Sequence, residues 1–284
     1  MKGKFYTQLW GGGKHDVKMG ALISSLLFQP PASPTALPHD VRLLHLPCTL
    51  ADGSSGDIAA AFFAHRSASF TILFSHGNAE DLGTLCDWMQ ELSENLQANV
   101  LAYDYVGYGF SCSPAQADGK PTELNCYRSA EAALAYLVNR RGIAAESIVL
   151  WGRSLGTAMA CYLATSTNAA FRGLVLQSPL LSAYRIAFPF RFSLVGDSFR
   201  CVDMAARLRV HVLLVHGTRD AIVPVWHSYA LLRLIPHALL EEPLFVEGAG
   251  HNNVEATLEQ LARRKGRGAQ SRLFLAVKHL VGSH

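Results

Sequence analysis

The stretch Ser147-Ile148-Val149-Leu150-Trp151-Gly152-Arg153-Ser154-Leu155-Gly156 decides the fold expected for this chain of 284 residues. It joins a short apolar run to a G-x-S-x-G pentapeptide, and a helix-forming stretch, Thr157–Ala164, follows directly. In a nucleophile elbow, a sharp strand-to-helix turn lifts the serine above the sheet, and the two glycines prevent side-chain collisions at the turn. The helix that begins there also points backbone N–H groups at a developing anion. The pentapeptide therefore predicts that Ser154 is a nucleophile.

Apolar runs and helical patterns alternate on both sides of this pentapeptide. The expected strands are Val41–Thr49, Asp57–Ala64, Phe70–Ser75, Asn99–Tyr103, Ile148–Trp151, Gly173–Gln177, Val210–Val215 and Pro243–Val246. The expected helices are Leu82–Leu96, Glu123–Arg140, Leu155–Thr165, Val225–Leu234 and a C-terminal stretch that ends near Val281. Two strands followed by β-α alternation predict an α/β fold, in which a mostly parallel twisted sheet carries helices on both faces.

The composition excludes several classes of protein. Half of the residues are apolar and 17% are charged, which favours one folded domain over a disordered chain. The net charge is +3, and the densest basic run, Arg263–Lys265, is typical of a solvated surface, with contact to anionic lipid headgroups as the alternative. We therefore expect no nucleic-acid partner. The six cysteines are scattered without a C-x-x-C pair, so we expect reduced thiols, no metal and no other cofactor.

Residues 1–40 are interpreted as an N-terminal arm and residues 41–284 as the folded domain. The arm contains a short apolar segment, Ala21–Phe28, between a run of glycines and a cluster of prolines. Two interpretations stay open: the segment lies on a membrane as an anchor, or it packs on the domain. The expected location is cytoplasmic, with peripheral contact to the cytoplasmic face of a membrane as a further option. The oligomeric state stays open.

Ser154 needs partners, because a serine hydroxyl becomes a good nucleophile only when a histidine held by a carboxylate removes its proton. In this arrangement the acid and the histidine follow the serine in the chain. Asp220 comes shortly after the expected strand Val210–Val215, and His251 comes shortly after the strand Pro243–Val246. Because the carboxyl ends of parallel strands meet at one edge of a sheet, we expect Ser154, Asp220 and His251 to converge there.

The oxyanion of the reaction also needs donors. The backbone N–H of Leu155, the residue after the nucleophile, is the first expected donor. The second comes from the loop after the third strand, where the best candidate is Asn78 and the alternative is Ala79. His76 in this loop is interpreted as an orienting residue rather than a base, and His216 as structural packing.

A glycine-rich turn, Asp104–Ser111, follows the strand that ends at Tyr103. It lacks the Gly-Lys-Ser/Thr sequence of a P-loop, so a structural turn that lines the site is favoured over a phosphate cradle. Asp104 precedes Ser154 in the chain, and this order argues against Asp104 as the acid of the triad.

The connection at about 178–209 is unusually rich in aromatic residues and is expected to form a short lid. Part of it belongs to the core, and its apolar side is interpreted as the binding surface for a hydrocarbon chain. The candidate substrate-binding residues are Leu180, Tyr184 and Phe188.

These motifs resemble those of serine-type α/β-hydrolases and, more narrowly, of the α/β-hydrolase domain-containing protein 17 family, acyl-protein thioesterases that remove palmitate from cysteines. The similar stretches are Ser75–Gly83, Tyr103–Gly109, Gly152–Gly156, Ser178–Pro189, His216–Asp220 and Val246–Asn252. The resemblance implies an α/β-hydrolase fold and the triad Ser154, Asp220 and His251, in agreement with the chain order. Two departures are the lack of a cysteine before Cys48, where the family has a palmitoylated cluster, and a stretch, Arg263–Ser271, that resembles an insertion.

The sequence thus predicts a serine hydrolase that cleaves ester or thioester bonds, with depalmitoylation of an acylated protein favoured and a small acyl ester as the other substrate class. A serine peptidase or a small-ester carboxylesterase is the alternative within hydrolases. A binding module without catalysis is the alternative outside them, but such a module has no physical need for a serine, an acid and a histidine in catalytic order.

Overall fold

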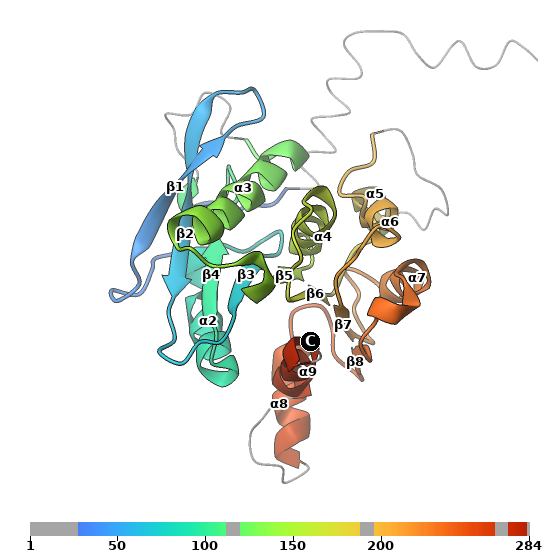
Figure 1. Ribbon diagram of the computed structural model, residues 1–284. Coiled ribbons are helices and arrows are strands. Elements are labelled where there is room, and N and C mark those ends of the chain that lie inside the picture. Colours follow the sequence, from blue (N-terminus) through green and yellow to red (C-terminus); the bar gives the residue numbers. More distant parts are fainter. Residues whose placement is uncertain (1–27, 112–119, 188–195, 265–271, 283–284) are drawn as a thin grey trace, which may run out of the picture.

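The computed structural model describes residues 28–111, 120–187, 196–264 and 272–282. Within these ranges the chain builds an eight-stranded sheet with the order β1-β2-β4-β3-β5-β6-β7-β8 (Figure 1). Strand β2 pairs antiparallel with β1 and β4, and every other pair is parallel. The strands are β1 Leu43–Thr49, β2 Ser55–Phe63, β3 Thr71–Ser75, β4 Asn99–Tyr103, β5 Ile148–Arg153, β6 Gly173–Gln177, β7 Val212–Gly217 and β8 Leu244–Val246. The predicted α/β-hydrolase fold is confirmed, and each expected strand begins and ends within two residues of its prediction.

Helices cover both faces of the sheet (Figure 1). The helices are α2 Leu82–Leu96, α3 Glu123–Ala135, α4 Gly156–Ser166, α5 Ala183–Ala187, α6 Cys201–Ala205, α7 Trp226–Leu234, α8 Val254–Arg264 and α9 Arg272–Gly282. Buried side chains of α3, α4, α6 and α7 share one core with one face of the sheet, and those of α2, α8 and α9 share a second core with the other face. Strands β3, β6 and β7 are buried at every position, which explains why they are continuous apolar runs in the sequence.

Two helical predictions differ from the structure. The helix expected over Glu123–Arg140 ends as an α-helix at Ala135 and continues as a wider π-type turn, Tyr136–Arg140, in which the Arg141 N–H bonds the carbonyl of Tyr136. The expected C-terminal stretch is two helices, α8 and α9, that contact each other. Helix α8 begins three residues after His251, and it buries Val254 and Leu258 one turn apart.

The described end of the N-terminal arm lies on the domain. Phe28 is buried, and its ring makes an edge contact with that of Phe199 at 5.7 Å. Further along, the Thr35 N–H bonds the Asp81 carboxylate at 2.7 Å, and Asp81 also caps the start of α2. Residues 28–35 therefore follow the edge of the sheet where the candidate site lies.

Several predictions fall partly outside the described residues. These are the arm before residue 28, the middle of the lid at 188–195, and the basic run beyond Arg264. In the part of the chain that the structure describes, no helix combines the length and the apolar character needed to cross a membrane.

Candidate active site

Ser154 follows strand β5 and adopts a left-handed backbone conformation, with φ of +52°. Such a conformation in a residue other than glycine costs on the order of 1–3 kcal/mol and is typical of functional turns. Its N–H is fixed by the carbonyl of Gln177 on β6, at 2.9 Å. A Cβ on Gly156 would lie 1.9 Å from the carbonyl oxygen of Ser75, and one on Gly152 would lie 2.4 Å from that of Gly156. The turn therefore requires both glycines of the pentapeptide.

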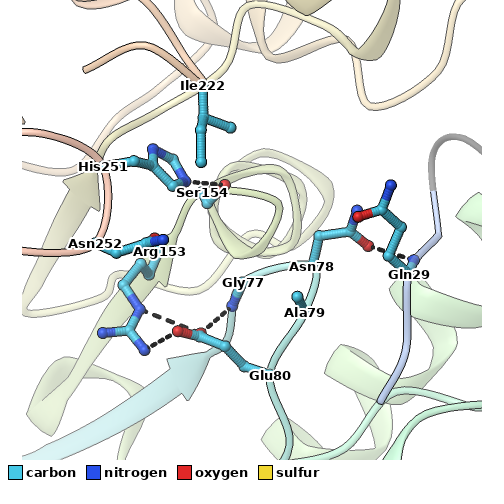
Figure 2. Close-up of a pocket in the computed structure, with 10 residues that line it drawn as sticks. All are labelled: Gln29, Gly77, Asn78, Ala79, Glu80, Arg153, Ser154, Ile222, His251 and Asn252. Atoms are coloured by element: carbon cyan, nitrogen blue, oxygen red, sulfur yellow. Dashed lines mark hydrogen bonds and ion pairs between the residues drawn. The ribbon is translucent and has the colours of Figure 1, made fainter. Parts of the chain in front are cut away.

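The three residues expected to converge do so at the carboxyl ends of β5, β7 and β8. His251 Nε2 lies 2.9 Å from Ser154 Oγ (Figure 2), and His251 Nδ1 lies 2.6 Å from Asp220 Oδ2. A carboxylate oxygen only accepts hydrogen bonds, so Nδ1 carries the proton of the neutral ring. Nε2 then has a free lone pair, and it accepts the hydrogen bond from the Ser154 hydroxyl. This is the geometry that general-base activation of a serine requires.

Asp220 is buried and fully surrounded by donors. The N–H groups of Ile222 and Val223 bond its Oδ1 at 2.9 and 2.8 Å. Burial by itself raises the pKa of Asp220, but hydrogen bonds from His216 and His251 outweigh burial and hold this pKa well below its ordinary value. The carboxylate is therefore ionised wherever His251 would need it to balance a positive charge.

His216 has a closer relation to the site than its sequence interpretation as structural packing. The ring is fully buried, and Nε2 lies 3.2 Å from Asp220 Oδ2 and 2.8 Å from the carbonyl of Val223. Nδ1 lies 2.7 Å from the hydroxyl of Ser228 on α7. His216 therefore packs in the core and also binds the carboxylate that holds His251. Its position four residues before Asp220 is the one sequence signal that points to this contact.

The candidate oxyanion donors differ in availability. The N–H of Gly77 is already bonded to the Glu80 carboxylate at 2.7 Å, and this excludes it. Within the described residues, the backbone N–H groups of Leu155, Asn78 and Ala79 have no acceptor. Asn78 and Ala79 line the same cleft as Ser154 (Figure 2). The N–H groups of Asn78 and Ala79 are therefore both available as the second oxyanion donor, and the catalytic role of each stays a prediction.

An ion-pair network that the sequence analysis missed joins this loop to the elbow. Arg153, the residue before the serine, pairs with Glu80 (Figure 2). Arg153 also lies 3.4 Å from Glu255 on α8. Glu255 also accepts a hydrogen bond from the side chain of Gln177 at 2.6 Å. The sequence carries no motif for these contacts, since the middle positions of G-x-S-x-G are free and Glu80 and Glu255 are far apart in the chain.

Two hollows meet at Ser154. A cleft of about 420 Å³ is lined by Gln29, Gly77, Asn78, Ala79, Glu80, Arg153, Ser154, Ile222, His251 and Asn252. A pocket of about 300 Å³ is lined by Gln29, Asn78, Ser154, Leu155, Leu180, Ala183, Ile186, Phe199, Ile222 and Val223. The cleft combines the charged side chains of Glu80 and Arg153 with apolar surface, whereas the pocket is mainly apolar, so the site offers two chemically different sides to one substrate.

The three predicted substrate-binding residues have different outcomes. Leu180 lines the apolar pocket. Tyr184 lines neither hollow. Its N–H bonds the Asp197 carboxylate, and its hydroxyl lies beside Gly196, where an added Cβ would be 3.2 Å away. Phe188 lies outside the described residues. Gln29, from the N-terminal arm, lines both hollows and was missed, since nothing in the local sequence indicates that the arm reaches the site.

Asp104 is a buried carboxyl group beneath the loop of His76. It accepts the N–H groups of Leu82 and Phe110, each at 2.9 Å, and so ties the start of α2 to the glycine-rich turn. His76 Nε2 lies 3.7 Å from Asp104 Oδ1, and burial lowers the pKa of His76. Burial raises the pKa of Asp104 to about 7. Asp104 is therefore mostly protonated in mildly acidic solution.

This raised pKa predicts a pH dependence of stability. Between about pH 4 and pH 7 the unfolded chain has released the Asp104 proton, whereas the folded chain still binds it. The folded state then binds more protons than the unfolded state, so stability falls as the pH rises through this window, by up to about 1.4 kcal/mol per pH unit. Urea unfolding of the wild type and of Asp104→Asn at several pH values gives the free energy of unfolding of each protein as a function of pH. The difference between the two slopes against pH measures the contribution of Asp104. Equal slopes would contradict it.

No metal site is formed in the described ranges: within 28–111, 120–187, 196–264 and 272–282, no group of three or more His, Cys, Asp or Glu side chains is placed to hold a metal ion.

Comparisons with known proteins agree with the fold. Residues 71–200 match the family described as alpha/beta hydrolase fold. The esterase Pf2001 of Pyrococcus furiosus superimposes with a TM-score of 0.61 at 17% identity, over 84% of this chain and 96% of that one. At this identity the likeness shows the fold alone. The fold and the family match define the chain as an α/β-hydrolase.

Sequence similarity narrows the class. The chain is 40% identical over 200 residues to alpha/beta hydrolase domain-containing protein 17C of Mus musculus. The matched region covers 70% of this chain and 59% of that protein. It is 38% identical over 221 residues to alpha/beta hydrolase domain-containing protein 17B of Homo sapiens, and the matched region covers 77% of this chain and 73% of that protein. The chain belongs to the α/β-hydrolase domain-containing protein 17 family, as the motifs predicted. It spans about 59% of the length of the 17C relative from Mus musculus.

Proposed function

We propose that this hydrolase is a serine acyl-transfer enzyme that cleaves esters or thioesters, and that acylated proteins are its substrates. The observation that carries the proposal is the hydrogen-bonded chain from Ser154 through His251 to Asp220, with distances of 2.9 and 2.6 Å. A serine hydroxyl, an imidazole with a free lone pair and a buried carboxylate are the parts that acyl transfer to water requires.

In the proposed reaction, His251 takes the proton of Ser154 while Oγ attacks the carbonyl carbon of the substrate. The negative charge that develops on the carbonyl oxygen is stabilised by the N–H of Leu155 and by that of Asn78 or Ala79. His251 then gives its proton to the leaving thiol or alcohol, and an acyl-enzyme forms. Water, deprotonated by the same imidazole, attacks the acyl-enzyme, and the acid leaves as Ser154 regains its proton.

The two hollows favour a substrate with two unlike ends. The apolar pocket, whose walls include Leu180, Ile186 and Phe199, fits a hydrocarbon chain. The cleft of mixed lining, which carries the charged side chains of Glu80 and Arg153, fits a peptide or another polar leaving group. Ser154 lies where the two hollows meet, so a scissile carbonyl there would have its acyl side in one and its leaving group in the other. We propose further that the enzyme works in the cytoplasm and meets acylated proteins at a membrane surface.

The proposed acyl pocket predicts a dependence on chain length. Each additional buried methylene contributes up to about 0.8 kcal/mol, so kcat/KM for a series of acyl thioesters is expected to rise by up to about fourfold per methylene until the pocket is full. Ile186→Asp places a charge on the pocket wall at a side chain that is already 37% exposed. This variant is expected to lose the preference for long chains and to keep its activity on an acetyl thioester.

The matched control is Leu275→Asp, which changes a similarly exposed side chain on α9, a helix on the opposite face of the sheet. It is expected to keep the chain-length preference of the wild type. An aminoacyl amide series measured beside the thioesters separates the two classes of hydrolase. Faster cleavage of amides than of thioesters, with no effect of acyl length, would favour a peptidase.

A further inference from the structure

The side chain of Asn78 joins three separate parts of the chain. Its amide oxygen accepts the backbone N–H of Gln29 at 3.0 Å (Figure 2) and the hydroxyl of Tyr108 at 2.6 Å. A backbone N–H only donates, so the atom that faces Gln29 is the oxygen, and the orientation of the amide is fixed. The N-terminal arm and the glycine-rich turn thus hold the same loop from two sides.

A second tyrosine, Tyr105, binds the same loop two residues before Asn78. The hydroxyl of Tyr105 donates to the carbonyl of His76 at 2.7 Å, and His76 Nδ1 lies 2.7 Å from the carbonyl of Gly77. The rings of Tyr105 and Tyr108 are fully buried and make an edge contact at 5.4 Å. Two rigid side chains from one turn therefore bind two positions, His76 and Asn78, of a loop that belongs to no helix or strand.

We propose that Tyr108 is a positioning residue for hydrolysis and that it acts through Asn78. By holding the Asn78 amide oxygen, the Tyr108 hydroxyl fixes the path of the backbone from Gly77 to Ala79. This path decides where the N–H groups of Asn78 and Ala79 point. The inference rests on the proposed function, since the direction of these groups matters only if an oxyanion forms beside Ser154.

Oxyanion donors stabilise the transition state because they are already oriented before the reaction, and this stabilisation falls steeply when they are misplaced. Loss of one such donor typically lowers kcat by about 10²–10³-fold, and a catalytic group needs to be held within about 0.5 Å of its working position. Without the Tyr108 hydroxyl, Asn78 keeps its bond to Gln29, and Tyr105 keeps its bond to His76. We therefore expect a partial effect, about tenfold on kcat, because the donors remain but are held less firmly.

The turn offers a matched control for this substitution. Tyr103 is equally buried and contacts the ring of Tyr105, but its hydroxyl bonds Ser75 Oγ at 2.7 Å and does not reach the loop. Tyr103→Phe and Tyr108→Phe each remove one buried hydroxyl from the same aromatic cluster. A general loss of stability would affect both variants, whereas loss of positioning would affect only the second.

The experiment measures kcat and KM of these variants and of Asn78→Ala on p-nitrophenyl butyrate. In Tyr108→Phe, kcat is expected to fall about tenfold with KM changed less than twofold, and Tyr103→Phe is expected to stay within twofold of the wild type. Asn78→Ala keeps its backbone N–H and still loses activity. The double variant Asn78→Ala with Tyr108→Phe falls no further than Asn78→Ala alone, because both changes remove the same interaction.

Two results would overturn the proposal. One is a kcat for Tyr108→Phe equal to that of Tyr103→Phe. The other is a loss confined to Asn78→Ala, which would mean that Asn78 acts without Tyr108, through its bond to Gln29 or on the substrate directly. If the wild type neither cleaves the ester nor reacts with a fluorophosphonate, the proposed function fails. NMR order parameters of the Gly77–Ala79 amides then test the positioning, since they are expected to fall in Tyr108→Phe but not in Tyr103→Phe, and unchanged values in Tyr108→Phe would refute it.

Discussion

Ser154→Ala is expected to lower kcat/KM for an acyl thioester on the order of 10⁴–10⁶-fold, without a loss of stability. The reaction loses the oxygen that forms the acyl-enzyme, and no other hydroxyl lies within hydrogen-bond distance of His251 among the described residues. Alanine keeps the Cβ, so the strain of the left-handed backbone at φ +52° is the same as with serine. Initial rates over a range of thioester concentrations measure the loss, and thermal unfolding verifies that the fold is kept.

The chain provides a close control for this experiment. Ser178 also follows a strand, also has a left-handed backbone at φ +48°, and is also buried. Its hydroxyl has no hydrogen-bond partner in the part of the chain that the structure describes. Ser178→Ala is therefore expected to retain activity within twofold. An active Ser154→Ala, or an inactive but folded Ser178→Ala, would mean that Ser154 is not the nucleophile.

The sequence predicts the sheet well because its information is local. Five of the eight strands are parallel strands buried by helices on both sides, and a run such as Gly173–Gln177 stands out whatever the rest of the chain does. The predicted meeting of Ser154, Asp220 and His251 follows from topology. Since each residue comes after its own strand, the common edge of the sheet brings the three together. In the structure His251 lies between the other two, 2.9 Å from Ser154 Oγ and 2.6 Å from Asp220 Oδ2.

What the sequence does not predict depends on side-chain contacts between distant segments. The aromatic side chain of Tyr184 suggests a pocket residue. In the structure its N–H bonds Asp197, a contact between two parts of the lid that no local sequence pattern indicates. Gln29 reaches the site through contacts with distant segments: its N–H bonds Asn78, and the neighbouring Phe28 packs on Phe199, 171 residues later in the chain. His216 was correctly expected to be buried, but burial alone does not reveal that its ring faces the carboxylate of Asp220.

Asp220→Asn is expected to lower kcat by about 10⁴-fold, the loss found when the acid of such a triad becomes an amide. Two backbone N–H groups, those of Ile222 and Val223, point at Oδ1, so the amide oxygen of an asparagine must take that place. Its NH₂ group then faces His251 Nδ1. Because this group only donates, the imidazole must carry its proton on Nε2, which can no longer accept the proton of Ser154.

The same substitution tests the electrostatic part of the argument. The pKa of Asp220 is lowered in the folded state, so its charge stabilises the protein above the ordinary pKa of about 3.9 and this contribution is lost as the pH falls toward the folded value. Asp220→Asn removes the contribution and turns the NH₂ group toward His216 Nε2, another donor. The variant is therefore expected to be less stable than the wild type at pH 7, with a difference that narrows below about pH 3.9, as measured by urea unfolding at pH 7 and pH 3. A folded Asp220→Asn that keeps more than a tenth of the wild-type kcat would show that His251 does not depend on this carboxylate for its tautomer.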